Sequence, residues 1–175
     1  MDNFPHKTAP SRDSTLTFRE ITKGNYVDVA TLRFKDGQTG NLSSNVWSLL
    51  ASCFEEDAWV RAIYADETLV GMLMMEIWDP TESYHIWRFM IDGRYQRLGY
   101  GRRSVQFAIA HIRQNHPKAK QLKLRSTPRE GKENAAKPKK TVKPEDSPYR
   151  FYEKLGFREI GPPDEDGDIL MAMDL

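Results

Sequence analysis

The strongest constraint on the fold is a single change in the spacing of apolar residues in the middle of the chain. Residues 60–64, 69–78 and 84–91 are strand-like apolar runs, and only short polar turns separate them. Residues 105–112 then place apolar side chains at i, i+3, i+4 and i+7, which is one face of a helix. We therefore expect antiparallel neighbouring strands followed by a helix that covers them.

The flanking segments extend this pattern in both directions. Upstream, we expect a strand at 15–21, a helix at 25–34 capped by Asn25, and a helix over 46–54 capped by Ser44 or Asn45. Downstream, we expect a strand at 121–126, a helix at 148–156 capped by Ser147, and a hairpin formed by 157–160 and 169–173. Helices and strands in this order predict an α+β domain.

Length and composition indicate one soluble globular domain. The 175 residues suffice for one buried core, and 39% hydrophobic with 29% charged residues is ordinary for such a domain. The formal charge of +1 argues against a nucleic-acid partner. A single cysteine, Cys53, excludes an intramolecular disulfide and a zinc site built on several thiolates, so we expect no metal and a cytoplasmic location.

Two segments differ in composition from the rest. Residues 1–14 contain charge and proline but no apolar run, so we expect a disordered tail rather than a signal or membrane anchor. Residues 128–146 are rich in lysine and proline, and they cannot bury enough apolar surface to offset the entropy of ordering. We therefore assign the domain to residues 15–175, with a mobile loop at 128–146 and no membrane span.

The sequence RYQRLGYGRR lies between an expected strand and an expected helix. The first turn of a helix leaves backbone N–H groups unpaired, and Gly99 and Gly101 would let a pyrophosphate approach them closely. Arg97, Arg102 and Arg103 add positive charge. A helix-initiating turn with solvated arginines is the alternative. The stretch lacks the third glycine of a dinucleotide fingerprint and the lysine of a P-loop.

YQRLGYGR resembles the Gln/Arg-x-x-Gly-x-Gly segment of GNAT acetyltransferases, and FYEKLGF is similar to a late segment of that family. More narrowly, YHIWRFMIDGRYQRLGYGR, AWVRAIY and LVGMLM resemble bacterial spermidine/spermine (diamine) N-acetyltransferases. The resemblance implies a GNAT acyl-CoA N-acyltransferase fold, a three-layer α/β sandwich with a mixed, mostly antiparallel sheet flanked by helices. It also implies acetyl-CoA as cosubstrate, contacted by Met90, Ile91, Gln96, Arg97, Leu98, Gly99, Tyr100, Gly101 and Arg102.

Acetyl transfer to an amine requires a group that accepts the amine proton, because an alkyl amine with a pKa of about 10.4 is almost fully charged at neutral pH. Glu76, His85 and Asp92 are the candidates, and we rank Glu76 first. The resemblance assigns the general acid, which stabilises the departing thiolate, to Tyr152. Packing of Tyr152 in the core is the alternative. Glu145 stands where many family members carry an asparagine.

The acceptor is expected to be a polyamine or another small primary amine. Glu55 and Glu56, with Asp57, Asp79 and Glu82, could line an acidic mouth, and Trp87, with Trp78, could contact an amine through its ring. A protein N-terminus or lysine is the nearest alternative acceptor, and a drug or an amino acid is also possible. Two further alternatives are a binding module that uses lysines of 132–143, and a member that binds acyl-CoA without turnover. A homodimer stays open.

Overall fold

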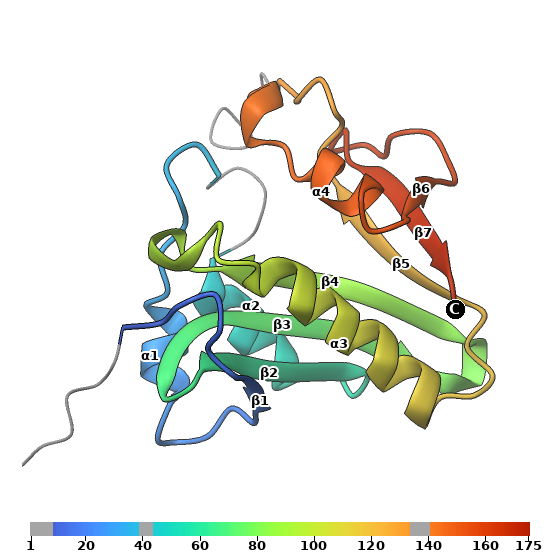
Figure 1. Ribbon diagram of the computed structural model, residues 1–175. Helices are drawn as coiled ribbons and strands as arrows, with labels where there is room; N and C mark the ends of the chain where they lie inside the picture. The colour runs from blue at the N-terminus through green and yellow to red at the C-terminus, as the bar shows by residue number, and fades with distance from the viewer. Residues whose placement is uncertain (1–8, 39–43, 134–140) are drawn as a thin grey trace, which may run out of the picture.

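The computed structural model describes residues 9–38, 44–133 and 141–175, which form one central sheet (Figure 1). Its seven strands lie in the order β1-β2-β3-β4-β5-β7-β6. They are β1 (Leu16–Arg19), β2 (Ala58–Ala65), β3 (Thr68–Trp78), β4 (Ser83–Ile91), β5 (Gln121–Ser126), β6 (Arg158–Glu159) and β7 (Ile169–Asp174). All neighbours are antiparallel except β4 and β5, which are parallel. The expected mixed, mostly antiparallel sheet is confirmed.

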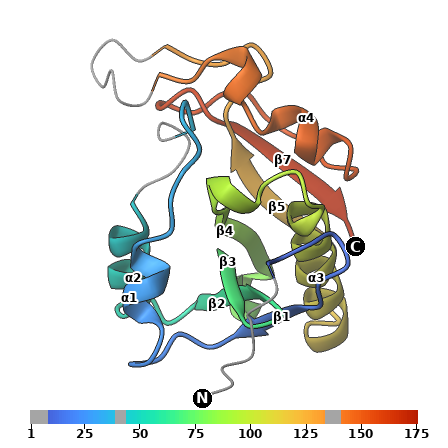
Figure 2. The same cartoon turned by 60° about the vertical axis from the view of Figure 1, so that its left-hand side comes forward.

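Helices cover both faces of the sheet, so the domain has three layers (Figure 2). One face carries α3 (Tyr100–Asn115) and α4 (Tyr149–Glu153), and the other carries α1 (Tyr26–Ala30) and α2 (Asn45–Ser52). Short 3-10 helices lie at η1 (Asp79–Thr81), η2 (Gly93–Tyr95) and η4 (Pro144–Asp146). The parallel step from β4 to β5 passes through α3, because parallel neighbours need such a crossover.

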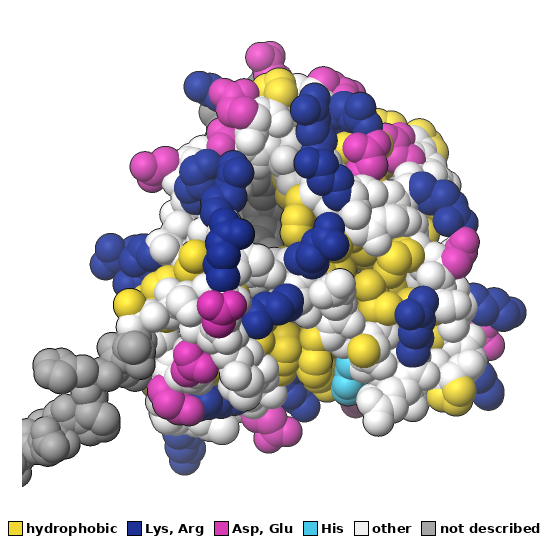
Figure 3. Space-filling model, in the orientation of Figure 1, with side chains coloured by type: hydrophobic (Ala, Val, Ile, Leu, Met, Phe, Trp, Pro, Cys, Tyr) yellow, Lys and Arg dark blue, Asp and Glu magenta, His cyan; other side chains and the backbone are white. Residues whose placement is uncertain are grey.

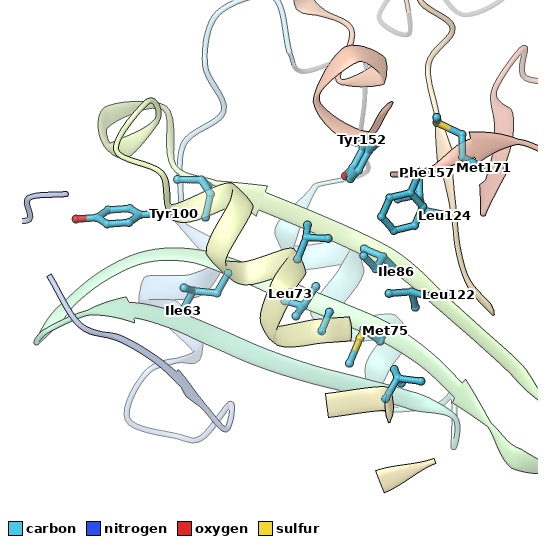
Figure 4. Close-up of a cluster of buried hydrophobic side chains, with 14 of the residues drawn as sticks. Ile63, Leu73, Met75, Ile86, Tyr100, Leu122, Leu124, Tyr152, Phe157 and Met171 are labelled. Carbon is cyan, nitrogen blue, oxygen red and sulfur yellow. The ribbon is translucent and has the colours of Figure 1, made fainter. Parts of the chain in front are cut away.

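Two apolar clusters stabilise these layers. The larger lies between the sheet and the helices α3 and α4 (Figure 4), and the smaller lies between the sheet and α1. Strand β3 contributes to both, because Leu73 and Met75 face α3 while Met72 and Met74 face α1. A strand that is buried on both faces needs a continuous apolar sequence, which explains why residues 69–75 contain no charged side chain.

Helix α1 is shorter than the sequence predicts. It ends at Ala30, and Asn25 makes no capping hydrogen bond to it. Arg33, expected on this helix, instead joins the end of β4: its N–H donates to Asp92 Oδ2 at 2.8 Å, and its carbonyl accepts from Gly93 N–H at 2.8 Å. These tertiary hydrogen bonds replace the last turn of the predicted helix.

Helix α2 begins as expected, since the Ser44 hydroxyl accepts from Trp47 N–H at 3.3 Å. Its buried face differs from the expected apolar stripe: Leu49 packs inward, whereas Val46, Leu50 and Phe54 are 60%, 47% and 78% exposed. The Asn45 side chain is buried and donates to the Leu32 carbonyl at 3.0 Å. This hydrogen bond turns the polar start of the helix toward the core.

Parts of the two compositionally unusual segments are packed. Carbonyl groups of Ser11 and Ser14 accept hydrogen bonds from the side chains of Tyr100 and Arg103, at 2.6 and 2.9 Å. Val142 is 3% exposed and pairs with Lys132 across a short bridge. Residues 1–8 and 134–140, which include the rest of the expected tail and the middle of the expected mobile loop, lie outside the described residues.

Candidate active site

A cleft of about 920 Å³ opens where β4 and β5 separate. The two strands pair only at His85–Lys123 and Ile86–Leu124, and beyond this point they diverge (Figure 1). On its other side, β4 pairs with β3, but the register passes from Met75–Ile86 to Met74–Arg88. Trp87 is therefore an extra residue, and such a β-bulge bends its strand. The bend occurs just where pairing with β5 ends.

The separation leaves main-chain groups of β4 facing the cleft. Asp92 N–H donates to the Val70 carbonyl on β3 at 2.8 Å, and the direction of main-chain groups alternates along an antiparallel strand. The N–H and C=O groups of Ile91 and Phe89 therefore face the open edge, while those of Met90 face β3. Met90 also lines the cleft, although its side chain packs in the smaller cluster and its main chain pairs with β3.

The glycine loop lies at one end of this cleft, directly before α3. Gly99 has φ 84° and Arg97 has φ 67°, so the chain turns sharply into the helix. The first α-helical hydrogen bond runs from Arg103 N–H to the Gly99 carbonyl at 3.2 Å, so the preceding N–H groups have no partner within the helix. Gly101 faces α4, where a Cβ would lie 3.3 Å from the Phe151 ring. These groups form a cradle suited to a phosphate.

Lysine and arginine side chains surround the mouth of the cleft on this side. Figure 3 shows them on both sides of a hollow in the surface. The residues of this basic rim are Lys35, Arg97, Arg102, Arg150 and Lys154. Their charge would favour a polyanionic ligand in the cleft.

Tyr152 projects from α4 into the cleft wall. It is 8% exposed, and its hydroxyl points toward β4, away from Phe157 and Leu124 (Figure 4). Burial raises the pKa of Tyr152 above its ordinary value, so the hydroxyl stays protonated across the physiological range. Among the described residues, no side chain or main-chain group accepts its proton, so this donor is free for a ligand.

Glu76 and His85 lie side by side on β3 and β4, on the face that carries α1 and α2, and both line the cleft. A Glu76 oxygen accepts from the Ser83 hydroxyl at 2.7 Å. Burial lowers the pKa of His85, and the Glu76 carboxylate opposes this shift without overcoming it. A carboxylate beside a neutral imidazole is a suitable proton acceptor.

Two loops that are distant in the sequence meet at the rim of the cleft. A Cβ on Gly37, in the loop after α1, would lie 2.3 Å from Asp146 Oδ2 in η4. Gln96 supports the same loop, because its Nε2 donates to Gln38 Oε1 at 2.9 Å and to the Ile91 carbonyl at 3.0 Å. The Gly37–Asp146 contact joins the loop that contains the cleft residues Lys35 and Gln38 to the segment that contains Glu145 and Ser147.

A model of the acetyltransferase (GNAT) family matches residues 27–157. The chain belongs to this family. Its members are acetyltransferases, with acetyl-CoA as cosubstrate, and the strand separation, the glycine cradle and the position of Tyr152 provide a matching site. A search of curated protein sequences finds no match.

Solved structures confirm the GNAT fold over most of the chain. PaiA N-acetyltransferase from Thermoplasma acidophilum, crystallised with coenzyme A, superposes with a TM-score of 0.64 at 16% identity, covering 92% of this chain and 99% of that one. A spermidine N-acetyltransferase SpeG chimera from Vibrio cholerae gives 0.61 at 17% identity, with 92% and 96% covered. The ribosomal-protein-S18-alanine N-acetyltransferase of Escherichia coli gives 0.60 at 17% identity, with 91% and 94% covered.

Not every expected site residue of this GNAT enzyme lies in the cleft. Leu98 packs against the larger core cluster, and Tyr100 directs its side chain toward Ser11, so only its main chain faces the cradle. Glu55 and Glu56 are exposed in the turn between α2 and β2 and do not line the cleft. All the expected coenzyme residues except Leu98 contribute to the lining: Met90, Ile91, Gln96, Arg97, Gly99, Tyr100, Gly101 and Arg102.

Two other acidic candidates of this GNAT enzyme, Asp92 and Asp79, stabilise the fold instead of facing the cleft. Asp92 is fully buried; burial alone would raise its pKa, but hydrogen bonds from Arg94 and Arg33 lower it. Asp79 accepts from Tyr84 and contacts His116 at the β3–β4 turn, outside the cleft. Neither carboxylate is available to an acceptor amine.

Sequence reasoning missed two GNAT cleft residues, Phe89 and Arg88. Phe89 follows from the strand register, which the sequence alone does not reveal. Arg88 carries a usable signal, because a charged residue between Trp87 and Phe89 in a buried strand is unusual. Within the described residues, no helix of the enzyme is long and apolar enough to cross a membrane.

Proposed function

We propose that this enzyme transfers an acetyl group from acetyl-CoA to the primary amine of a small molecule, by direct attack within a ternary complex. The observation that carries the proposal is the open edge of β4. It lies between the phosphate cradle on one side and the Glu76–His85 pair on the other. A thioester placed along this edge would meet an amine that enters from the Glu76 side.

The described residues fit acetyl-CoA. The N–H groups at the start of α3 and the basic rim would hold the pyrophosphate. The main-chain groups of Phe89 and Ile91 would hold the pantetheine arm and the acetyl carbonyl, since a fixed backbone donor stabilises developing negative charge on that oxygen. The coenzyme supplies an activated acetyl group and a thiolate leaving group.

The remaining steps use side chains of the cleft. Glu76, directly or through water, accepts a proton from the ammonium form of the acceptor. The neutral nitrogen then bonds to the carbonyl carbon, the carbon–sulfur bond breaks, and the electron pair leaves with the sulfur. Tyr152 donates a hydrogen bond to the departing thiolate, because its hydroxyl is protonated and has no other partner in the described part of the chain. The nitrogen then loses its second proton, which reaches the thiolate through water, so the products are a neutral amide and a free thiol.

A small acceptor is favoured over a protein acceptor by the Gly37–Asp146 contact. At this contact the two loops close the cleft, since each loop supplies lining residues beside it, whereas a polypeptide acceptor needs an open groove. Spermidine acetyltransferases are among the structures of this fold, but at 17% identity that likeness supports the fold and not the acceptor. The acidic residues expected to attract a polyamine, Glu55 and Glu56, lie outside the cleft lining. We therefore propose a small primary amine without restricting it to polyamines.

The test is an assay of free thiol released from acetyl-CoA in the presence of polyamines, amino acids and N-terminal peptides. We expect turnover with small amines and none with peptides. In parallel, Glu76→Gln should lower kcat/KM at least about tenfold, since a general base of this kind contributes 10²–10⁴-fold. Coenzyme that binds with no turnover on any amine would refute the enzymatic assignment, and turnover confined to peptides would refute the small acceptor.

A further inference from the structure

Arg88 is a charged side chain of the cleft wall that the reaction described above does not use. It lies on β4 directly after the bulge and is half-buried. Its Nη1 donates to the Trp87 carbonyl at 2.8 Å, and its guanidinium carbon lies 5.3 Å from the Trp87 ring centroid. Burial lowers the pKa of this guanidinium, and the charge of Asp168 offsets part of the shift. A half-buried charge is costly unless an anion compensates it.

No carboxylate pairs with Arg88 among the residues that the structure describes. Its neighbours in the wall differ in this respect, because Arg125 and Lys132 each pair with an aspartate of the β6–β7 loop, at 2.7 and 2.5 Å. The stretches outside the described residues contain one acidic side chain, Asp2, at the far N-terminus. Arg88 is therefore a half-buried cation of the cleft wall with no paired carboxylate among the described residues.

Arg88 lies on the acceptor side of the sheet. It pairs with Met74, which faces the α1 cluster, so it shares the face of Glu76 and His85 rather than that of α3. The phosphate cradle belongs to α3 on the opposite face (Figure 2). A ligand for Arg88 would therefore be the acceptor and not the nucleotide part of the coenzyme.

We propose that the acceptor is an amino acid, and that Arg88 binds its carboxylate while its amine faces the open edge of β4. This inference rests on the proposed function. A guanidinium can hold a carboxylate through two parallel hydrogen bonds, and the remaining donors of Arg88 have no partner among the described residues. Arg88 is adjacent to Phe89, whose main-chain groups face the open edge, so the carboxylate and the amine of one small amino acid can reach Arg88 and that edge together.

The experiment compares acceptors that differ only at the distal group. Three series of two to four carbons each contain a carboxylate, its amide and the corresponding diamine: for example 4-aminobutanoate, 4-aminobutanamide and 1,4-diaminobutane. L-alanine and L-alaninamide form a further pair. Release of free thiol gives kcat/KM for every compound. We expect the best acceptor to be a carboxylate, with its amide at least about tenfold poorer.

Variants of Arg88 then test whether this residue causes the preference for carboxylates. We expect Arg88→Gln to lower kcat/KM at least about tenfold for the carboxylates and less than about threefold for the amides. Arg88→Lys should recover only part of the loss, because an ammonium lacks the planar fork. The KM for acetyl-CoA should stay unchanged in both variants.

Arg61→Gln is a matched control. Arg61 lies on β2, its Nη1 donates to the Val60 carbonyl at 2.8 Å, and its guanidinium lies 4.3 Å from the Trp59 ring. It therefore makes the same kinds of backbone and ring contact as Arg88, with an added contact to Glu20 Oε1 at 3.5 Å, but it does not line the cleft. We expect this variant to leave the preference for carboxylates intact.

Three results would overturn the inference while leaving the acetyltransferase function intact: diamines or amides as good as the carboxylates, an equal loss on all acceptors in Arg88→Gln, or a raised KM for acetyl-CoA in that variant. The absence of thiol release with every compound would instead refute the proposed function itself.

Discussion

The hydroxyl of Tyr152 is on a buried side chain, and its O–H has no hydrogen-bond acceptor among the described residues. A tyrosine ordinarily ionises near 10 and a thiol near 8.5, so full proton transfer to the thiolate is slightly uphill in water. Burial raises the tyrosine pKa further and makes such a transfer less favourable. Tyr152 therefore serves better as a hydrogen-bond donor to the thiolate than as an acid that loses its proton.

We predict that Tyr152→Phe lowers kcat at least about tenfold while the affinity for acetyl-CoA stays near that of the wild type, because the lost hydrogen bond forms as the thiolate leaves. Steady-state kinetics and calorimetric titration measure the two effects. Tyr149→Phe is the control, since Tyr149 lies on the same helix but donates to Glu159 at 2.6 Å outside the cleft. An unchanged kcat in Tyr152→Phe would remove this residue from the mechanism.

His85 gives a prediction on pH. Burial lowers its pKa below the ordinary value of about 6.5. The unfolded chain then binds a proton more readily than the folded chain does. His85 therefore does not change the free energy of unfolding above pH 6.5, and it lowers this free energy as the pH falls from 6.5 to the folded pKa. Urea unfolding at a series of pH values should show this loss in the wild type and a smaller one in His85→Gln. A folded His85 that titrates at or above 6.5 by NMR would contradict the prediction.

At the scale of elements, β4 determines the chemistry of the cleft. Its bulge at Trp87 and its short pairing with β5 free one edge, and its other edge must stay fixed against β3 for the site to hold its shape. Gly71 on β3 permits that fit, because a Cβ there would lie 2.4 Å from the Met90 carbonyl oxygen. The two strands are thus as close as a glycine allows.

Gly71→Ala should therefore lower the free energy of unfolding by about 1–3 kcal/mol, the usual cost of overpacking a core. Because the displaced segment precedes Ile91 at the open edge, kcat should also fall. Urea unfolding and the thiol assay measure both. Gly161→Ala is the control, since no atom lies within 4 Å of a Cβ at that position. Equal stability of the two variants would show that β3 and β4 can separate without cost.

The sequence predicts elements best where local pattern and tertiary contacts agree. All seven strands and α3 follow from apolar spacing, and the loop before α3 follows from its glycines. The predictions for α1 and α2 are partly wrong because hydrogen bonds between distant segments decide their ends and orientation. One joins Arg33 to Asp92, and another joins Asn45 to Leu32.

The candidate site was likewise predictable only in part from the sequence. Motif residues at the start of α3 and Tyr152 on α4 lie together in the cleft, because a motif carries its own local geometry. The acceptor side depends on which strand faces converge, and the sequence placed Glu55 and Glu56 there while missing Arg88. Pairing register and a bulge decide that convergence, and both are properties of two strands rather than one.

For the whole molecule, the coenzyme is expected to act as a structural bridge. The part that contains β5, β6, β7 and α4 joins the rest of the sheet through only two residue pairs between β4 and β5. A ligand that fills the cleft contacts both parts, and a ligand that binds only the folded state raises stability by mass action.

Acetyl-CoA at about 100 times its Kd should therefore add about 2.7 kcal/mol to the free energy of unfolding. For a domain of this size that corresponds to a rise in Tm of roughly 5–10 °C, measurable by calorimetry. In Gly101→Val the new side chain would press on Phe151 and disturb the start of α3, so acetyl-CoA should raise the Tm of this variant far less, relative to its own unliganded Tm. An equal rise in both proteins would place the coenzyme elsewhere.

The contact between Gly37 and Asp146 also limits how this protein can be re-engineered. Surface loops usually accept grafts one at a time, because their lengths vary independently among homologues. Here one loop abuts another that lies more than a hundred positions further along the chain. A chimera with a different loop after α1 would therefore need a matching replacement in the segment before α4. If only one of the two loops were replaced, they would either clash or leave a gap at the rim of the cleft.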